Sequence, residues 1–421
     1  MELSEKYKKT EVGLLPDDWS VKSIDEISYI RTGPFGTLLS ASEYSSNDGV
    51  PLVSVGEIGA GFFKITERTP RIPEHVTRRL PQYILRDGDI VFGRKGAVDR
   101  SALVSVLEDG WFLGSDGLSI RPKTPYHSPY VAAQLQASTV RSWLIKNATG
   151  TTMPSLNQAV LGRLQIPYAP ETEQRAIAAA LSDIDALLSG LDRLIAKKRA
   201  LKQAAMQQLL TGKTRLPGFE GEWEVRRLGE LSEVRGGLAK NVSVAIQDPV
   251  SVAYLRVANV QDGHVDLSDV SFISIPRQEL RRYSLRAGDV LMNEGGDLDQ
   301  LGRGAVWRGQ IDPCIHQNHV FAVRCGDSLL PDYLNAWTSG VQARQYFMLA
   351  GKQTTNLASI SKSSLGELPV ALPSVAEQQA IAAVLADMDA ELEALEARRE
   401  KTQVLKQGMM QELLTGRTRL V

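Results

Sequence analysis

The chain contains one long segment twice, and this duplication limits the possible folds more than any other feature. Residues 173–216 recur at residues 377–420, at a constant offset of 204 positions, and more than half of the paired positions are identical. A repeat of this length predicts two copies of one structural unit within the chain.

Each copy of the repeat predicts one long α-helix. Apolar residues recur at steps of four and three over residues 177–195 and 381–395, which is the pattern of a heptad seam. Neither copy contains proline, and each stops at a glycine, Gly212 or Gly416, the residue favoured just past a helix end. A helix of roughly 40 residues is about 60 Å long. One apolar stripe on such a helix needs a partner, and we expect the two copies to pair antiparallel.

The repeat continues into the segments that precede the helices. Trp19 matches Trp223 at the same offset, and Leu85-Arg-Asp-Gly-Asp matches Leu285-Arg-Ala-Gly-Asp at an offset of 200. Short β-rich runs between glycine loops, together with helical segments, predict an α+β domain in each half. We therefore predict two similar globular α/β domains separated by two long antiparallel coiled-coil helices, with an internal pseudo-two-fold repeat. The predicted limits are residues 1–170 and 216–372 for the domains and 171–215 and 373–421 for the helices.

Charge, cysteine count and hydropathy favour a protein of the reducing cytoplasm. The formal net charge is −1, so any attraction to nucleic acid must come from local clusters. Two cysteines, Cys314 and Cys325, are too few for a disulfide framework. No apolar run reaches the length of a membrane span, and the charged first residues are unlike a signal peptide. We expect a cytoplasmic location and no membrane contact.

No segment predicts a catalytic centre. Gly212-Lys-Thr resembles the end of a phosphate-binding loop, but Gln207 stands where that motif requires glycine, so a helix terminator is favoured. Gly59-Ala-Gly lacks the Asn-Pro-Pro-aromatic loop that would accompany a methyl-donor site, and a turn between strands is favoured. The chain is therefore predicted to be non-catalytic and to need no cofactor of its own.

Four residues with ligand-type side chains lie close together in the second half. They have the spacing Cys314-x-His316-x2-His319-x5-Cys325, which raises the possibility of zinc. The two histidines would point to opposite faces of a strand, and the matching segment of the first half has neither His nor Cys. We therefore predict no metal site here and favour polar loop residues that face a ligand.

Basic and amide side chains gather on predicted loops in both halves. Such side chains bind phosphates and read base edges, although for each residue alone a solvated surface is the alternative. Their recurrence in both halves favours DNA binding, and unlike loops on equal scaffolds predict two different targets. The candidate DNA-binding residues are Arg78, Arg79, Arg94, Lys95, Arg100, Thr151, Thr152, Arg281, Arg282, Asn293, Gln300, Arg303, Gln317, Asn318, Lys352, Thr354 and Thr355.

The repeated motifs resemble those of the specificity (S) subunits of type I restriction–modification enzymes. The resemblance spans nearly the whole chain, and the doubled architecture is its most specific part. The motifs are Gly13-Leu-Leu-Pro-Asp-Asp-Trp19, Leu85-Arg-Asp-Gly-Asp-Ile90, Pro170-Glu-Thr-Glu-Gln174 and Leu209-Leu-Thr-Gly212, with their second copies.

This resemblance implies that each globular domain is a target-recognition domain that reads one half of a split, double-stranded DNA site. It implies that the paired helices hold the domains apart and bind two modification (methyltransferase) subunits, with restriction/translocase subunits in the same complex. Adenine-N6 methylation and DNA cleavage, with S-adenosylmethionine, ATP and Mg, then belong to those partner subunits. Base-reading residues vary between members of the family, so no particular contact carries over.

Residues of the helical seam are the predicted partner-binding set. They are Ile177, Leu181, Ile184, Leu188, Ile381, Leu385, Met388 and Leu392. Two basic clusters lie where the seam is interrupted in mid-helix and would meet in an antiparallel pair. They are Lys197, Lys198 and Arg199, and Arg398, Arg399 and Lys401. DNA phosphates, acidic residues of a partner or solvent could balance their charge.

Two other classes of function compete with a DNA reader. A pure scaffold would use its domains to bind protein, and a methyltransferase or nuclease would act on DNA itself. The enzyme interpretation suffers from the missing motifs. Protection of a split DNA sequence by the assembled complex would separate reader from scaffold.

Overall fold

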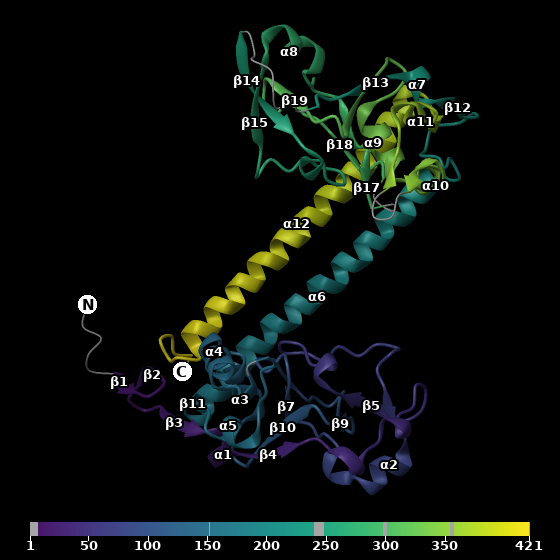
Figure 1. Cartoon of the computed structure of the whole chain (residues 1–421). Helices are drawn as coiled ribbons and strands as arrows, with labels where there is room; N and C mark the ends of the chain where they lie inside the picture. Colours follow the sequence, from purple (N-terminus) through teal and green to yellow (C-terminus); the bar gives the residue numbers. More distant parts are fainter. Residues whose placement is uncertain (1–6, 151, 240–247, 298–300, 354–357, 421) are drawn as a thin grey trace. The chain divides into compact units, whose positions relative to one another are not determined.

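The computed structural model describes residues 7–150, 152–239, 248–297, 301–353 and 358–420 (Figure 1). The chain divides into two compact units, which we call unit 1 (Met1–Asp192 with Arg398–Val421) and unit 2 (Arg193–Ala397). The division cuts both long helices, so each unit combines segments from both sequence repeats. No described helix is both long and apolar enough to cross a membrane.

The two copies of the repeat form the predicted long helices. Helix α6 spans Glu171–Leu209 and helix α12 spans Val375–Leu413, 39 residues each. Both are followed by a glycine in the left-handed region, Gly212 at φ +67° and Gly416 at φ +68°. Since a residue with a Cβ is strained in that conformation, glycine ends both helices as predicted.

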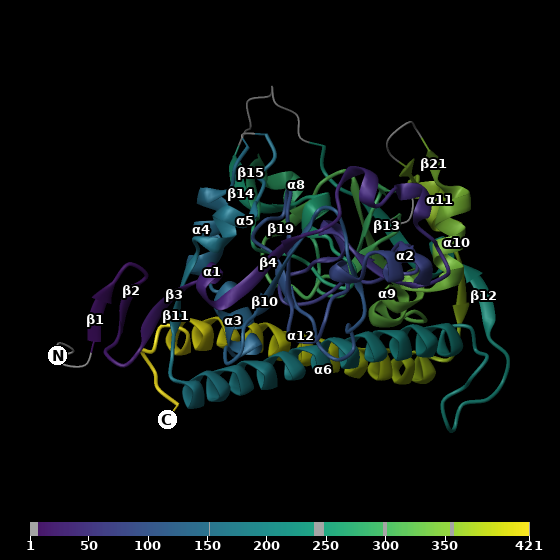
Figure 2. The same cartoon turned by 90° about the horizontal axis from the view of Figure 1, so that it is seen from below.

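Within each unit the two helices run antiparallel (Figures 1 and 2), which confirms the predicted orientation. Ion pairs between the helices support this orientation, because residues further along α6 pair with residues nearer the start of α12. The pairs are Asp185–Lys406 and Asp192–Arg399 (2.5 Å each) in unit 1 and Lys198–Glu391 and Arg199–Glu396 (2.6 Å each) in unit 2. Acidic residues of the opposite helix therefore balance several of the basic residues in the middle of the seam. Exposed pairs of this kind contribute about 0–1 kcal/mol each, so they favour one register more than they stabilise the fold.

The globular part of each unit is built on a four-stranded antiparallel sheet, and the strand order is the same in both. In unit 1 the order is β4 (Ser28–Thr32), β10 (Gly117–Pro122), β7 (Ile90–Gly93) and β8 (Ser101–Leu103). In unit 2 it is β13 (Ser232–Gly236), β20 (Val320–Cys325), β16 (Val290–Asn293) and β18 (Gly304–Val306). The sequence repeat is therefore a repeat of topology.

A smaller sheet accompanies each four-stranded sheet, and its central strand has one antiparallel and one parallel neighbour. In unit 1 it contains β6 (Arg71–Ile72), β5 (Val50–Val53) and β9 (Phe112–Leu113). In unit 2 it contains β15 (Ser271–Pro276), β14 (Pro249–Leu255) and β19 (Cys314–His316). Helix α2 (Glu74–Arg79) follows β6, and α8 (Arg277–Tyr283) follows β15.

Helices complete each globular part, as expected for an α+β domain. Unit 1 has α1 (Ile24–Ile27), α3 (Ser128–Leu135), α4 (Ser138–Asn147) and α5 (Gln158–Gly162), and unit 2 has α7 (Leu228–Leu231), α9 (Pro331–Ser339), α10 (Val341–Ala350) and α11 (Lys362–Gly366). Short two-stranded ladders pair β1 (Tyr7–Thr10) with β2 (Gly13–Pro16), β3 (Ser20–Ser23) with β11 (Gln165–Tyr168), and β12 (Glu224–Arg227) with β23 (Pro369–Leu372).

A buried tryptophan–glutamate–arginine cluster joins the start of α6 to the end of the chain in unit 1. The carboxylate of Glu173 is fully buried and accepts hydrogen bonds from Trp19 Nε1 at 2.9 Å and Arg419 Nε at 2.6 Å. Asp18 holds the other side of the same guanidinium at 2.7 Å. These two carboxylates raise the pKa of Arg419 above its usual value, chiefly through the hydrogen bonds they accept.

Unit 2 contains the same cluster with the repeats exchanged. Glu377 is 1% exposed and accepts hydrogen bonds from Trp223 Nε1 at 3.1 Å and Arg215 Nε at 2.5 Å. Each arginine follows the helix of one repeat and binds the glutamate that opens the helix of the other. Ser374 and Glu377 have the spacing of a capping box, but only half of it forms. Ser374 Oγ accepts the Glu377 N–H at 3.3 Å, while the Glu377 carboxylate turns inward to the arginine.

The second repeated motif also has a structural role. Asp89 accepts two hydrogen bonds from Arg121, at 2.6 Å each, and a third from the backbone N–H of Arg86 at 2.9 Å. In unit 2, Asp289 makes the same bonds to Arg324, at 2.8 and 2.7 Å. Both aspartates are buried, so the Gly-Asp of this motif fixes a turn inside each domain.

Candidate nucleic-acid interface

Three loops of unit 1 meet at one edge of its four-stranded sheet. Gly93 at the end of β7 pairs with Gly117 at the start of β10, and Phe92 pairs with Ser101 at the start of β8. The residues just outside those pairs therefore share one edge. We call residues 94–100, 114–116 and 152–155 the loop edge of unit 1.

Polar side chains at this edge are held in place by their neighbours. The guanidinium of Arg94 stacks on the ring of Phe35, 4.3 Å from its centroid, and Lys95 Nζ lies 3.5 Å from Asp116 Oδ1. Two backbone hydrogen bonds tie Arg94 to the adjoining loops. The N–H of Arg94 donates to the carbonyl of Asp116, and the N–H of Leu156 donates to the carbonyl of Arg94, at 2.8 Å each. The loop edge thus presents cationic donors on a fixed backbone.

The loop edge of unit 2 is equivalent by register. Asn293 at the end of β16 pairs with Val320 at the start of β20, and Met292 pairs with Gly304 at the start of β18. The described residues of this edge are 294–297, 301–303, 317–319 and 352–353. Lys352 joins it because β21 (Lys352–Gln353) and β17 (Gly295–Gly296) both pair with β22 (Ala358–Ser359).

Six of the predicted DNA-binding residues are brought to these two edges with polar groups turned outward or half exposed. They are Arg94, Lys95 and Arg100 in unit 1 and Gln317, Asn318 and Lys352 in unit 2. Thr152 is exposed beside the unit 1 edge, and Arg303 is half buried at the unit 2 edge, with an Nε that has no hydrogen-bond partner among the described residues. Thr151, Gln300, Thr354 and Thr355 lie outside the described residues.

The comparisons with known proteins agree with this geometry. Residues 16–198 match the family described as the type I restriction modification DNA specificity domain. The EcoKI specificity subunit of Escherichia coli K12 is 25% identical over 383 residues, covering 88% of this chain and 82% of that protein. The StySPI specificity subunit of Salmonella potsdam is 23% identical and covers 88% of this chain and 81% of that protein.

A solved structure supports the fold. The S subunit of a type I restriction–modification system from M. genitalium superposes with a TM-score of 0.59 at 15% identity, covering 98% of both chains. This chain is therefore similar to type I specificity subunits over most of its length, and it shares their fold. The family resemblance inferred from the repeated motifs is therefore confirmed, as is the predicted fold class.

One predicted DNA-binding residue of this chain lies in the interior. Asn293 is 2% exposed, and its Nδ2 donates to the carbonyls of Val260 at 3.0 Å and Val257 at 3.4 Å. The amide therefore holds the neighbouring loop and cannot reach a base edge in this conformation. Its sequence context could not reveal this, because burial at the end of β16 depends on how the 257–260 turn packs.

Four predicted arginines lie on helices of the smaller sheets and not at the loop edges. Arg78 and Arg79 end α2, where Arg78 pairs with Glu74 at 2.5 Å and Arg79 donates to the carbonyl of Leu38 at 3.0 Å. Arg281 and Arg282 are exposed near the end of α8. The structure therefore gives Arg79 a supporting role beneath the loop that carries Phe35.

The cysteine–histidine cluster is dispersed. His316 is buried in β19 with its Nδ1 2.7 Å from the carbonyl of Val320, whereas His319 is exposed in the following turn and lies 2.8 Å from Glu294. Burial raises the pKa of Cys314 and of Cys325 to about 12 each and lowers the pKa of His316. No group of three or more metal-ligating side chains occurs among the described residues.

The seam residues predicted to bind partner subunits are occupied within the chain. Ile177, Leu181, Leu188, Ile381, Leu385 and Leu392 are each at most 8% exposed, and Ile184 and Met388 are half buried. Ile177 packs with the last residues of α12 in unit 1, and Ile381 packs with the last residues of α6 in unit 2. These side chains hold the helix pair together, so they cannot also be the surface that a partner covers.

A different stripe of α6 is open to solvent. Leu187, Leu194 and Leu201 are 42%, 38% and 47% exposed and are spaced seven residues apart, which puts them on one face of the helix. Val404 and Leu405 of α12 are also exposed, at 62% and 55%. The seven-residue spacing of these leucines was visible in the sequence, but the more regular apolar seam on the neighbouring face of the helix was the stronger pattern.

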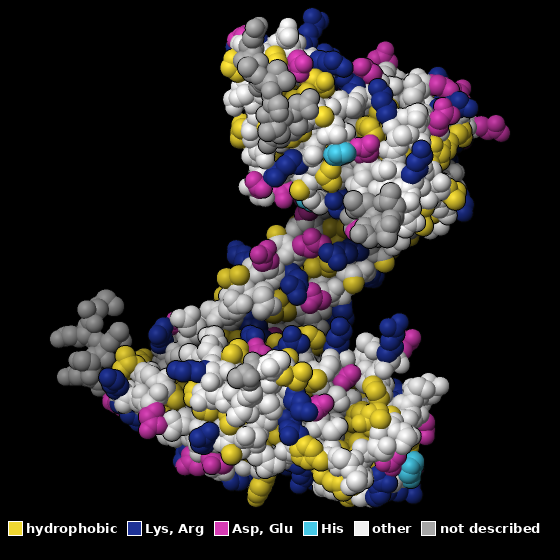
Figure 3. Space-filling view, viewed as in Figure 1, with side chains coloured by type: hydrophobic (Ala, Val, Ile, Leu, Met, Phe, Trp, Pro, Cys, Tyr) yellow, Lys and Arg dark blue, Asp and Glu magenta, His cyan; other side chains and the backbone are white. Residues whose placement is uncertain are grey.

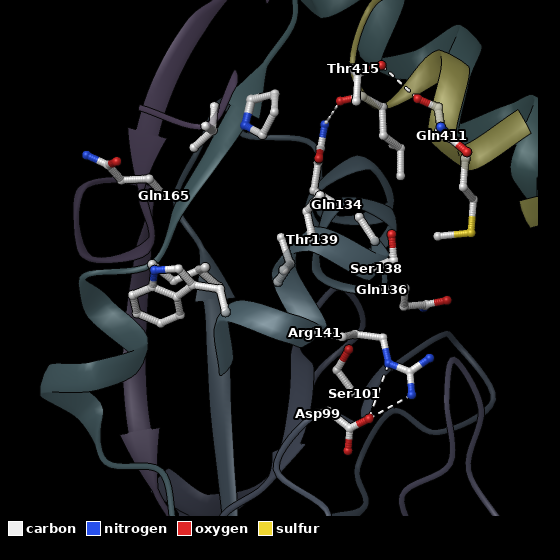
Figure 4. Close-up of a pocket in the computed structure, with 18 of the residues that line it drawn as sticks. Asp99, Ser101, Gln134, Gln136, Ser138, Thr139, Arg141, Gln165, Gln411 and Thr415 are labelled. Atoms are coloured by element: carbon white, nitrogen blue, oxygen red, sulfur yellow. Dashed lines mark hydrogen bonds and ion pairs between the residues drawn. The ribbon is translucent and has the colours of Figure 1, made fainter. Parts of the chain in front are cut away.

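Unit 1 also has a groove of about 700 Å³ between α3, α4 and the end of α12 (Figure 4). In it Arg141 pairs with Asp99 at 2.7 Å, and Gln134 Nε2 donates to the carbonyl of Leu414 at 3.0 Å. Its lining residues include no Cys or His. The Arg141–Asp99 pair ties the loop that carries Arg100 to α4.

Charge on the visible surface is mixed. On the face drawn in Figure 3, basic and acidic side chains alternate over both units. This agrees with the net charge of −1 and places any attraction for DNA in the local geometry of the loop edges.

Proposed function

We propose that this chain is the sequence-specific DNA-binding specificity subunit of a type I restriction–modification complex, and that each loop edge reads one half of a bipartite double-stranded target. The observation that carries this proposal is the pair of equivalent loop edges. They share one backbone frame but present different polar side chains. The same backbone geometry at both edges would bind DNA phosphates in the same way, and the different side chains would read different base sequences.

We further propose that the chain is non-catalytic and acts through its partners. Two modification subunits would supply adenine-N6 methylation with S-adenosylmethionine, and restriction/translocase subunits would supply ATP- and Mg-dependent cleavage. None of these cofactors is assigned to this chain. The expected location is the cytoplasm, in association with DNA.

The exposed leucine stripe of α6 is the proposed contact for the modification subunits. Heptad-spaced leucines that remain open after the α6–α12 seam has formed can bury against one more helix. Because these leucines are 38–47% exposed, burying what remains open would contribute about 0.6–1.4 kcal/mol for each. This surface replaces the seam residues as the candidate partner-binding set.

The test uses the chain assembled with its modification subunits. The complex is incubated with a randomised DNA pool and S-adenosylmethionine, and methylated adenines are mapped by sequencing. The expected result is methylation within one bipartite motif, with no methylation by the chain alone. Methylation without sequence preference would support a scaffold and overturn the proposal, and methylation by the purified chain alone would overturn its non-catalytic part.

A further inference from the structure

The two loop edges differ in charge at equivalent positions. The residue after β7 is Arg94 and the residue after β16 is Glu294, while Asp116 and His319 stand just before the facing strands β10 and β20. The backbone bond Arg94 N–H to Asp116 O (2.8 Å) has its counterpart in Glu294 N–H to His319 O (3.0 Å). The side chain after the central strand is thus cationic in unit 1 and acidic in unit 2, and the residue before the facing strand is an aspartate in unit 1 and a histidine in unit 2.

The third loop confirms that these positions correspond. The N–H of Leu156 donates to the carbonyl of Arg94, and the N–H of Ile360 donates to the carbonyl of Glu294, both at 2.8 Å. Each of these two residues therefore has its backbone fixed by the same two hydrogen bonds. Only the side chains change, so the difference in charge is not a consequence of a different local fold.

A second pair of positions at the same edges does not change. Arg100 precedes Ser101 of β8, and Arg303 precedes Gly304 of β18, and these strands pair with β7 and β16 in the same register. Both edges therefore keep one arginine in a fixed place. A residue that binds phosphate can be the same in both halves, because phosphates carry no sequence information.

Glu294 has the geometry of an oriented hydrogen-bond acceptor. Its Oε2 lies 2.8 Å from His319 Nδ1, and no described residue donates a hydrogen bond to its Oε1. Its side chain is 29% exposed and that of His319 is 58% exposed. In unit 1, the stacking of Arg94 on Phe35 instead leaves guanidinium N–H donors at the edge.

We propose that Arg94 and Glu294 are equivalent specificity-determining residues with opposite hydrogen-bonding sense. Arg94 reads a base that presents acceptors, as guanine does with O6 and N7, and Glu294 reads a base that presents a donor, as cytosine does with N4. His319 is a positioning residue that orients the Glu294 carboxylate. This inference rests on the proposed function, since it names residues for the reading of each half-site.

The experiment compares variants in the complete complex with its modification subunits, using the randomised DNA pool. Glu294→Gln removes the charge but keeps the size, and glutamine pairs with adenine. The expected result is a loss of roughly 5–150-fold in preference at one position of one half-site, equivalent to about 1–3 kcal/mol, with a shift from cytosine toward adenine. The other half-site keeps its preference. Arg94→Gln should change one position of the opposite half-site only.

Controls separate base reading from folding. Glu230→Gln removes a surface carboxylate of unit 2 that pairs with Arg226 at 3.2 Å, and it should leave both preferences unchanged. His319→Gln should weaken the same base position as Glu294→Gln without the shift toward adenine. If Glu294→Gln does not assemble, Glu294→Asp, which withdraws the carboxylate by one methylene, should relax that same position.

The outcomes distinguish this inference from the proposed function. A parent complex without any sequence preference overturns both. A selective parent whose preference survives Glu294→Gln and Arg94→Gln overturns the inference alone. Equal weakening at every position of both half-sites also overturns it, because that result assigns the residues to general DNA affinity.

Discussion

Removal of Arg419 should destabilise unit 1 by leaving a charge buried without its partner. The carboxylate of Glu173 is fully buried and is bound by Arg419 at 2.6 Å and Trp19 at 2.9 Å. In Arg419→Met only the indole N–H remains. Breaking a buried ion pair by removing one partner costs about 3–5 kcal/mol. We expect the lower end of that range, because the arginine side chain is 32% exposed and water can reach the vacated side.

A second substitution tests whether the buried charge is the cause. Glu173→Gln in the Arg419→Met background removes the unpaired charge while a side-chain oxygen can still accept from Trp19. The double variant should therefore be more stable than Arg419→Met alone. A loss of about 3 kcal/mol corresponds to a fall of roughly 6–12 °C in the melting temperature of a domain of this size.

Hydrogen exchange by mass spectrometry localises the effect to one unit. In Arg419→Met, faster exchange is expected in the first turns of α6, while those of α12 keep the parent rate. The matched variant Arg215→Met should reverse this, since Arg215 binds Glu377 in unit 2. A loss below about 1 kcal/mol in Arg419→Met, or a double variant that is less stable than the single one, would refute the reasoning.

Three further predictions address the helices and the second unit. Leu194→Glu puts a charge into the exposed leucine stripe of α6, so it should weaken binding of the modification subunits by about 10–100-fold, as measured by calorimetry. The helix content, measured by circular dichroism, should not change. An unchanged affinity would exclude this face of α6 as the contact. If the helix pair sets the distance between the two domains, longer helices should widen the unread DNA between the half-sites. Four helix-forming residues inserted after Ala196, with four more after Leu395 on the facing helix, lengthen each helix by about 6 Å and rotate it by about 400°. Methylation mapping should show the same half-sites separated by one or two more base pairs, and an unchanged separation would contradict this role of the helices. Burial lowers the pKa of His316 from its usual 6.5, so the unfolded state takes up the proton first as the pH falls. The free energy of unfolding should therefore decrease below about pH 6.5. Urea titrations from pH 7.5 to 5 should show a weaker pH dependence of this free energy in His316→Asn, and an equal dependence in parent and variant would refute the prediction.

Local features of the fold followed from the sequence because they depend on neighbouring residues. The heptad pattern predicted both long helices, and the glycines at 212 and 416 predicted where they stop, since only glycine adopts the left-handed conformation there without strain. Alternating β-rich and helical segments predicted an α+β domain in each half. The repeated motifs also indicated the resemblance to type I specificity subunits, because they recur in the same order in both halves of the chain.

Side-chain partners were decided by tertiary structure, since they join residues far apart in the chain. The sequence contained Glu173 and Arg419 as members of repeated motifs but could not show that each glutamate binds the arginine of the other repeat. Asn293 fits a DNA-reading loop by residue type, yet packing against the 257–260 turn buries its amide.

The same reason explains the candidate sites. Periodicity shows that α6 has an apolar stripe, but only the packed helix pair shows which leucines remain open after the seam closes. Glu294 is not among the predicted DNA-binding residues, and His319 is predicted only as a polar loop residue that faces a ligand. Strand register aligned Glu294 with Arg94, and that alignment depends on backbone hydrogen bonds between distant segments, which residue spacing alone does not determine.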